Sequence, residues 1–298
     1  MTVLVTGSTG LVGSSLVPHL EAGGHRVLRL VRASPKNDVE RRWDPETGEL
    51  APAALEGIQA VVHLAGENIA SGRWNEAKKS RIRSSREDGT QLLAQAIAES
   101  QTPPGVLISA SAVGYYGNRG DEILNEESPP GADYLAETCI AWENAARPAA
   151  DAGVRTVTLR IGIVLSADGG ALAKMLFPFK MGVGGVIGSG AQVMSWVSLS
   201  DLLGIIVHAL NTESLEGPVN AVSPAPATNR EFTKTLGSVL SRPTLFPMPA
   251  FAARLAFGEM ADALLLSGAR VTPARLQESG YDFQHPELEG ALRHVLDR

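Results

Sequence analysis

The sequence lacks the features of several large protein classes. One cysteine, Cys139, in 298 residues excludes an internal disulfide and a cysteine-based zinc site. Only 5% of the residues are aromatic, which disfavours the stacking surfaces that bind single-stranded nucleic acid. The 26 basic residues are outnumbered by 32 acidic ones, and a net charge of −6 disfavours a nucleic-acid partner. None of the six histidines is spaced as part of a metal site, so we expect no metal.

Long hydrophobic runs are also missing. The chain opens without the basic segment and long apolar run of a signal peptide. The longest uncharged stretch, residues 181–200, resembles a membrane span in length but contains five glycines and four serines. A glycine-rich loop beside a short strand explains it better. We therefore expect a cytoplasmic protein with no membrane partner.

What is present is an alternation of short apolar strands and longer helices. Strands are expected at residues 2–5, 26–31, 60–64, 106–110, 154–164 and 219–222. Helices are expected at residues 78–98, 135–152, 202–210 and 251–266. This order predicts an α/β fold, a Rossmann-type doubly wound parallel sheet with a smaller C-terminal substrate domain. We assign residues 1–165 and 191–222 to the nucleotide-binding domain, and residues 166–190 and 223–298 to the smaller one.

A glycine-rich loop follows the first strand. Gly7, Gly10 and Gly13 are spaced G-x-x-G-x-x-G between this strand and the first helix. In dinucleotide-binding proteins such glycines allow a tight turn, a close approach to the pyrophosphate, and close packing of helix and strand. The phosphate then meets free N–H groups at the start of the helix. A plain tight turn is the alternative, but the position in the first βαβ unit favours a nucleotide site.

The end of the second strand indicates which dinucleotide is bound. NAD sites usually carry an acidic residue here, which binds the ribose 2′-hydroxyl. This chain has Arg32 instead, and its first acid after the strand is Asp38. A guanidinium can bind a 2′-phosphate with two hydrogen bonds, so Arg32 predicts NADP(H). A solvated surface arginine is the alternative.

Further nucleotide contacts are expected after the third strand. The small residues near Leu64 and Ala65 can lie flat against adenine and ribose. A basic cluster follows, comprising Arg73, Lys78, Lys79, Arg81, Arg83 and Arg86. Such clusters are usually solvated helix faces, and Arg86 is the member that we single out as a candidate ligand for the nucleotide.

Together these segments resemble the extended short-chain dehydrogenase/reductase superfamily, and more narrowly its atypical sugar-nucleotide epimerase-like branch. The resemblance covers essentially the whole chain, including HLAGENIA from His63, the stretch from Leu159 to Asp201, and LLLSGARVTPARLQESGYDF from Leu264. It implies a Rossmann domain that binds NADP(H), with a C-terminal domain over a substrate cleft. The cofactor contacts it implies are Gly7, Ser8, Thr9, Gly10, Leu11, Val12, Gly13, Val31, Arg32, Leu64, Ala65, Arg86 and Val164.

The catalytic pattern of that superfamily is incomplete in this chain. The superfamily uses a serine or threonine together with a Tyr-x-x-x-Lys pair, in which lysine lowers the tyrosine pKa. Ser111 and Tyr134 are the candidate catalytic residues, but Thr138 stands where the lysine belongs. Without that positive charge, a tyrosine keeps its ordinary pKa of about 10. Tyr115 and Tyr116 are possible substitutes or simply aromatic residues that line the site.

Two functional hypotheses follow. The first is an NADP(H)-dependent oxidoreductase or epimerase that acts on a hydroxyl or carbonyl of a polar, possibly nucleotide-sugar-like, small molecule. The second is a catalytically weak redox sensor that binds NADPH and regulates a partner. Tyr134 or another acid or base near both Ser111 and the nicotinamide C4 would favour the first, and a buried apolar wall at that point would favour the second. The sequence allows a monomer or a homodimer.

Overall fold

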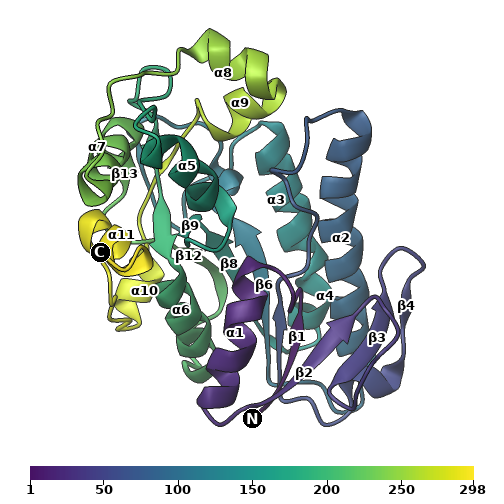
Figure 1. The fold of residues 1–298 in the computed structure, drawn as a ribbon. Helices are drawn as coiled ribbons and strands as arrows, with labels where there is room; N and C mark the ends of the chain where they lie inside the picture. Colours follow the sequence, from purple (N-terminus) through teal and green to yellow (C-terminus); the bar gives the residue numbers. More distant parts are fainter.

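An eight-stranded sheet forms the centre of the molecule (Figure 1). The computed structural model describes residues 1–298 except the side chain of Pro52. The strand order is β12-β8-β6-β5-β1-β2-β3-β4, and all neighbours are parallel except the β3–β4 hairpin. The strands of this sheet are β1 (Thr2–Thr6), β2 (Arg26–Val31), β3 (Glu40–Asp44), β4 (Glu49–Leu50), β5 (Ala60–His63), β6 (Val106–Ala112), β8 (Arg155–Ile161) and β12 (Gly217–Ala221). The predicted doubly wound Rossmann-type sheet is confirmed.

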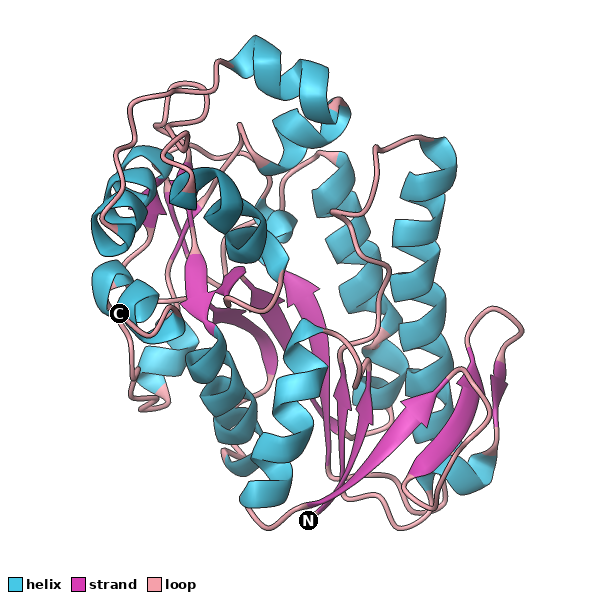
Figure 2. Cartoon of the chain, viewed as in Figure 1, coloured by secondary structure: helices cyan, strands magenta, loops and turns pink.

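Helices cover both faces of this sheet, as Figure 2 shows. Alternate residues of β1 point to opposite faces, so Val3 and Val5 pack with α1 (Leu11–Ala22) and α6 (Leu199–Asn211). Leu4 packs on the other face with α2 (Glu76–Glu99) and α4 (Arg147–Asp151). Since both faces of the central strands are buried, β1 and β5 are made mainly of apolar residues.

A smaller unit lies beside the carboxyl ends of the strands and has its own apolar core. Leu172, Trp196, Phe232 and Leu292 are among the side chains buried there. Its helices are α5 (Gly170–Lys180), α7 (Asn229–Leu240), α8 (Ala250–Phe257), α9 (Glu259–Leu264) and α11 (Leu288–Val295), whereas Leu276 of α10 (Ala274–Glu278) is buried in the core of the main sheet. Three short strand pairs lie outside the main sheet: β9–β11 (Ile163–Leu165, Trp196–Ser198), β10–β13 (Val193–Met194, Ala227–Thr228) and β7–β14 (Ile123–Leu124, Arg270–Val271). The predicted smaller domain, residues 166–190 and 223–298, is called the lid below, and Trp196, although buried in the same core, lies outside these bounds.

The strand expected at residues 154–164 is wrong in its length. It divides at Gly162 into β8, within the main sheet, and β9, which pairs with β11. A Cβ on Gly162 would lie 2.5 Å from the Ser195 carbonyl oxygen, so glycine permits the close crossing at this point. The hairpin of β3 and β4 was not predicted, because its residues are mainly polar and charged.

Two long helices that the pattern predicts are also divided. Residues 134–151 form α3 (Tyr134–Ala145) and α4, which separate just before Pro148. Proline has no N–H to continue the hydrogen-bond ladder. The helix expected at residues 251–266 breaks at Gly258, whose φ of +64° is left-handed, into α8 and α9. Two 3₁₀ turns, η1 (Pro52–Leu55) and η2 (Val113–Tyr116), complete the chain.

Candidate functional site

The glycine loop joins β1 to α1 with no room for side chains at two positions. Gly7 has φ +64°, and a Cβ there would lie 2.8 Å from the backbone of Leu64. A Cβ on Gly13 would lie 2.2 Å from the Gly7 carbonyl oxygen. Gly10 is the N-cap of α1, so the unpaired N–H groups of the first helical turn begin beside this loop. The arrangement fits a pyrophosphate at the helix N-terminus.

A buried relay of hydrogen bonds holds the strand ends beside this loop. The Thr6 hydroxyl accepts the N–H groups of Leu64 and Ala65 at 3.0 and 3.1 Å and lies 2.8 Å from His63 Nδ1. His63 Nε2 lies 2.9 Å from the Thr90 hydroxyl. Because the His63 ring is fully buried, its pKa falls to about 4 and it is neutral at pH 7. The relay fixes the backbone of two predicted cofactor contacts.

The remaining predicted cofactor residues border the same end of the sheet. Val31 ends β2, and Arg32 follows it as an exposed residue. Val164 lies in β9, across the loop. A Cβ on Gly170 would lie 3.1 Å from Leu11 Cδ2 and 3.6 Å from the Val164 carbonyl oxygen. The first turns of α5 and α1 therefore meet beside the glycine loop.

The segment of residues 64–73, between β5 and α2, is tied to α2 by charged side chains. Lys78, only 5% exposed, donates to Glu67 Oε1 at 2.5 Å and to the Ser71 hydroxyl at 2.7 Å. The Lys78 hydrogen bond lowers the pKa of Glu67, and the charges of Arg81 and Arg32 act in the same direction. Basic groups therefore surround Glu67, and one of them is Arg32, the predicted ligand of the 2′-phosphate.

Arg86 is tied to the same segment. Its Nη1 donates to the carbonyl oxygens of Glu67 and Ile82 at 3.1 and 2.9 Å, and its guanidinium lies 4.9 Å from the centre of the Trp142 ring. Burial lowers its pKa. Arg86 supports the backbone of the 64–73 segment, and whether it also contacts the nucleotide stays a prediction.

The lid contacts this segment and the start of α2 directly. Arg73 Nη2 donates to the Leu255 and Ala256 carbonyl oxygens, and Lys174 Nζ donates to the Ala70 carbonyl oxygen at 2.8 Å. Lys79 pairs with Glu259 of α9 at 3.1 Å. Arg73 and Lys79, two members of the basic cluster, therefore bind groups of the protein itself. The contacts place the lid against the chain segment that borders the predicted nucleotide.

The part of α3 that meets Gly114, just past β6 in η2, is apolar, whereas Glu143 of the same helix meets Ser111 of β6. A Cβ on Gly114, just past β6, would lie 3.4 Å from Leu135 Cβ and 3.7 Å from Cys139 Sγ. Leu135 and Cys139 are four residues apart, as a Tyr-x-x-x-Lys pair would be, but one position along from Tyr134 and Thr138. Burial raises the pKa of the Cys139 thiol to about 12, so it stays protonated. Neither the Leu135 side chain nor the Cys139 thiol gains or loses a proton near pH 7.

Ser111 is bound within a buried ion-pair network. Its hydroxyl donates to Glu143 Oε1 at 2.8 Å, and Glu143 forms two hydrogen bonds of 2.8 Å with Arg160. Burial opposes the charge on Arg160, but the contacts with Glu143 outweigh it and raise its pKa. Arg160 also stacks on Tyr115, 3.4 Å from the ring centre, and donates to the Tyr116 hydroxyl at 3.0 Å. Tyr115 and Tyr116 therefore belong to this network.

Tyr134 points to a different neighbour. Its hydroxyl donates to the Lys79 carbonyl oxygen of α2 at 2.8 Å, and its ring packs edge-on against Trp74. The Thr138 hydroxyl donates back to the Tyr134 carbonyl oxygen. Burial raises the pKa of Tyr134, the opposite of what proton transfer at neutral pH requires. Ser111 and Tyr134 thus have separate partners, and their catalytic role stays a prediction.

Sequence reasoning missed the partners of these groups. The Thr6–His63–Thr90 relay joins residues distant in the chain, and nothing in the local pattern marks it. Glu143 and Arg160 lie within a helix and a strand, where each resembles an ordinary surface charge. The orientation of α3 had a possible signal, since Leu135, Cys139 and Glu143 recur every four residues and therefore share one helix face.

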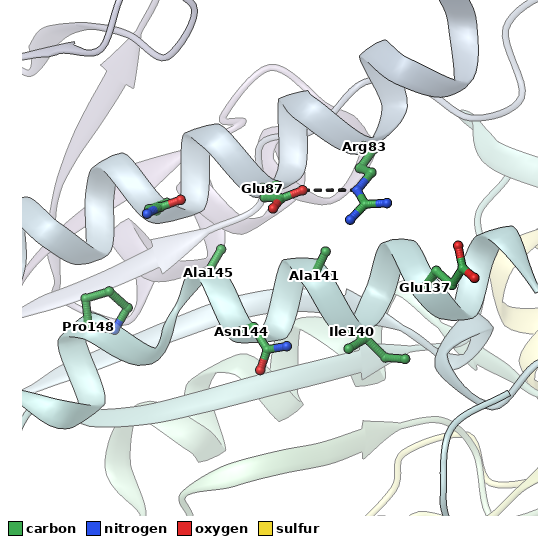
Figure 3. Close-up of a pocket in the computed structure, with 9 residues that line it drawn as sticks. Arg83, Glu87, Glu137, Ile140, Ala141, Asn144, Ala145 and Pro148 are labelled. Carbon is green, nitrogen blue, oxygen red and sulfur yellow. Dashed lines mark hydrogen bonds and ion pairs between the residues drawn. The ribbon is translucent and has the colours of Figure 1, made fainter. Parts of the chain in front are cut away.

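A groove of about 500 Å³ lies on the outer surface between α2 and α3 (Figure 3). Arg83 and Glu87 of α2 pair across one turn at 3.1 Å, and Ala141 and Ala145 of α3 line the opposite side. None of the predicted cofactor or catalytic residues lines it. Among the described residues, no three His, Cys, Asp or Glu side chains gather closely enough to hold a metal ion.

The sheet order, the glycine loop and the relay beside it define a dinucleotide-binding α/β protein. Residues 3–221 match the NAD dependent epimerase/dehydratase family, and residues 248–295 match a domain of unknown function, DUF1731. The chain belongs to the NAD dependent epimerase/dehydratase family. The predicted membership of an epimerase-like family is confirmed.

Similar proteins extend over the whole chain. Epimerase family protein Mb2239 of Mycobacterium bovis is 45% identical over 99% of this chain and 98% of its own length. The crystal structure of human epimerase family protein SDR39U1 with NADPH matches with a TM-score of 0.93, 38% identity and full coverage of both chains. UDP-glucuronic acid 4-epimerase from Bacillus cereus, at 18% identity and a TM-score of 0.78, shares the fold.

Proposed function

We propose that this protein binds NADP(H) at the carboxyl ends of β1, β2 and β5. The observation that carries the proposal is the glycine loop, where a Cβ on Gly13 would overlap the Gly7 carbonyl. Arg32, exposed directly after β2, supports a cofactor with a 2′-phosphate. The similar human protein was crystallised with NADPH, which supports the same choice.

Cofactor affinity tests this proposal. We expect Arg32→Ala to weaken NADPH binding by about 10- to 100-fold, because a charge-assisted contact contributes about 1.5–3 kcal/mol. NADH binding should not change, because NADH has no 2′-phosphate. Arg26→Ala is the matched control, since Arg26 is an exposed arginine at the opposite end of β2. Equal affinities of the wild-type protein for NADPH and NADH would overturn the assignment.

We further propose that the protein responds to NADP(H) rather than turning it over rapidly. Leu135 and Cys139, the α3 residues that meet Gly114 just past β6, offer no group that exchanges a proton near pH 7. The acid that contacts Ser111 is Glu143, but both of its carboxylate oxygens accept hydrogen bonds from Arg160, so it is held in an ion pair rather than free to transfer a proton. When bound, the cofactor supplies a hydride, but reduction of a carbonyl also needs a proton donor. This arrangement favours the catalytically weak sensor over the oxidoreductase or epimerase that acts on a polar small molecule.

The lid contacts suggest how bound cofactor is detected. Arg73 and Lys174 join the lid to the segment of residues 64–73, and this segment borders the proposed nucleotide site. A cofactor that shifts this segment would therefore change the lid contacts. We expect NADPH and NADP⁺ to differ in the protection that they give the lid against proteolysis.

The two candidate functions are separated by turnover. The wild-type protein is incubated with NADPH and a panel of carbonyl compounds and nucleotide sugars, and both absorbance and products are followed. We expect tight NADPH binding without multiple turnovers. Sustained turnover that Ser111→Ala or Tyr134→Phe abolishes, with NADPH binding intact, would instead establish the oxidoreductase or epimerase. Loss of NADPH binding in the wild-type protein would contradict both.

A further inference from the structure

The lid carries most of the exposed large apolar side chains of this protein. Eight of the ten in the described structure fall within residues 177–183 and 245–255, and we call these eight the lid patch. Phe177 is 75% exposed and Leu255 is 77% exposed. Apolar side chains scattered singly over a surface are ordinary, but a concentration in two neighbouring segments indicates an interaction surface.

The two segments lie side by side. Arg242 Nε donates to the Lys180 carbonyl oxygen at 2.9 Å, and the Met248 N–H donates to the Val186 carbonyl oxygen at 2.9 Å. Phe177 and Met181 are four residues apart at the end of α5, and Phe251 and Leu255 are four apart on α8. Residues at this spacing share one helix face. Figure 1 shows α8 at the end of the molecule opposite the N-terminus.

The two sequence stretches that carry the lid patch contain basic residues but no acidic ones. No acidic residue occurs between Asp168 and Asp201 or between Glu231 and Glu259, whereas the whole chain has a net charge of −6. The basic residues in these two stretches are Lys174, Lys180, Lys234, Arg242 and Arg254. Among the described ion pairs, only Arg254 of this set has a carboxylate partner, Asp262.

We propose that the lid patch docks on an anionic lipid bilayer surface. Apolar side chains that enter the interface, surrounded by lysine and arginine, are the combination that binds peripheral proteins to acidic membranes. None of the described helices is long and apolar enough to cross a membrane, and surface docking does not require one. The sequence-based expectation of no membrane partner considered only spanning segments.

Other occupants fit the same observations less well. In a two-fold dimer the patch would meet its own copy and bring unpaired lysines and arginines together, which is unfavourable. A small apolar ligand needs a concave site, but the hollow between α2 and α3 and a second one of about 680 Å³ beside α4 and β12 contain no lid-patch residue. An anionic bilayer matches both the apolar side chains of the lid patch and the basic residues in the same two stretches of the chain.

Flotation of the full-length protein with lipid vesicles tests the proposal. We expect binding to vesicles of phosphatidylcholine mixed with phosphatidylglycerol, and at least tenfold weaker binding to phosphatidylcholine alone. Phe177→Ser with Leu255→Ser should weaken binding to the mixed vesicles about tenfold or more. Lys180→Gln with Arg242→Gln should weaken it about 25-fold at low salt, at about fivefold for each charge near the membrane.

Matched controls make each outcome decisive. Ile123→Ser removes a large apolar side chain that is 70% exposed but lies on β7, outside the lid patch, and binding should not change. NADPH affinity and thermal unfolding confirm that every variant is folded. Absence of wild-type binding to mixed vesicles would overturn the proposal. So would equal binding by the patch variants, or a wild-type dimer in solution that the patch variants dissociate.

Discussion

The two ends of the predicted cleft differ in the chemistry of their supporting residues. At the nucleotide end, Gly7, Gly13 and the Thr6–His63–Thr90 relay shape the backbone for a phosphate-bearing ligand. At the reaction end, α3 presents an apolar residue and a protonated thiol, and the nearby charges are paired with each other. The residues that shape the nucleotide end are therefore distinct from those at the reaction end, so cofactor binding and proton transfer can be tested separately.

The largest effect is expected from the ion pair at the reaction end. Glu143→Ala leaves the guanidinium of Arg160, only 3% exposed, without its carboxylate partner. We expect a loss of about 3–5 kcal/mol in the free energy of unfolding, measured with denaturant. Glu87→Ala removes the partner of Arg83 from an exposed pair and should cost about 0.5 kcal/mol or less. A loss of stability in Glu143→Ala as small as that in Glu87→Ala would mean that the Glu143–Arg160 pair does not stabilise the fold.

The next effect is a pH dependence at the nucleotide end. His63 has a pKa of about 4 when folded and about 6.5 when unfolded, so the unfolded chain binds the extra proton between these values. Stability is therefore complete above pH 6.5 and falls as the pH drops towards 4, by at most about 1.4 kcal/mol per pH unit. His63→Gln should have a shallower slope in this window. Parallel slopes for the two proteins would rule out His63 as the source.

Glycine substitution tests the shape of the loop directly. A Cβ on Gly13 would overlap the Gly7 carbonyl, so Gly13→Ala should cost about 1–3 kcal/mol of stability and abolish measurable NADPH binding. Gly290→Ala is the control, because a Cβ there has open space within α11. It should add up to about 1 kcal/mol without changing affinity. Normal NADPH binding by Gly13→Ala would contradict the proposed pyrophosphate position.

The glycine loop was predictable because three glycines at fixed spacing between a strand and a helix are a local signal. The position of Arg32 directly after β2 was predictable for the same reason, and its contact with a 2′-phosphate stays a prediction. The reaction end depends on the rotational phase of α3, and a shift of one residue exchanges Tyr134 and Thr138 for Leu135 and Cys139. The network of Glu143 and Arg160 depends on contacts between distant segments. Neither is encoded in local periodicity.

The smallest expected effect separates a structural from a catalytic Tyr134. Tyr134→Phe removes one hydrogen bond, to the Lys79 carbonyl oxygen, so we expect a loss of about 1 kcal/mol in the free energy of unfolding. NADPH affinity should not change, because the hydroxyl is directed at α2 rather than at Ser111. Denaturant unfolding and NADPH titration of the same samples measure both. A variant with unchanged stability but weakened NADPH binding would place the hydroxyl at the nucleotide, and the contrast between the two ends would fail.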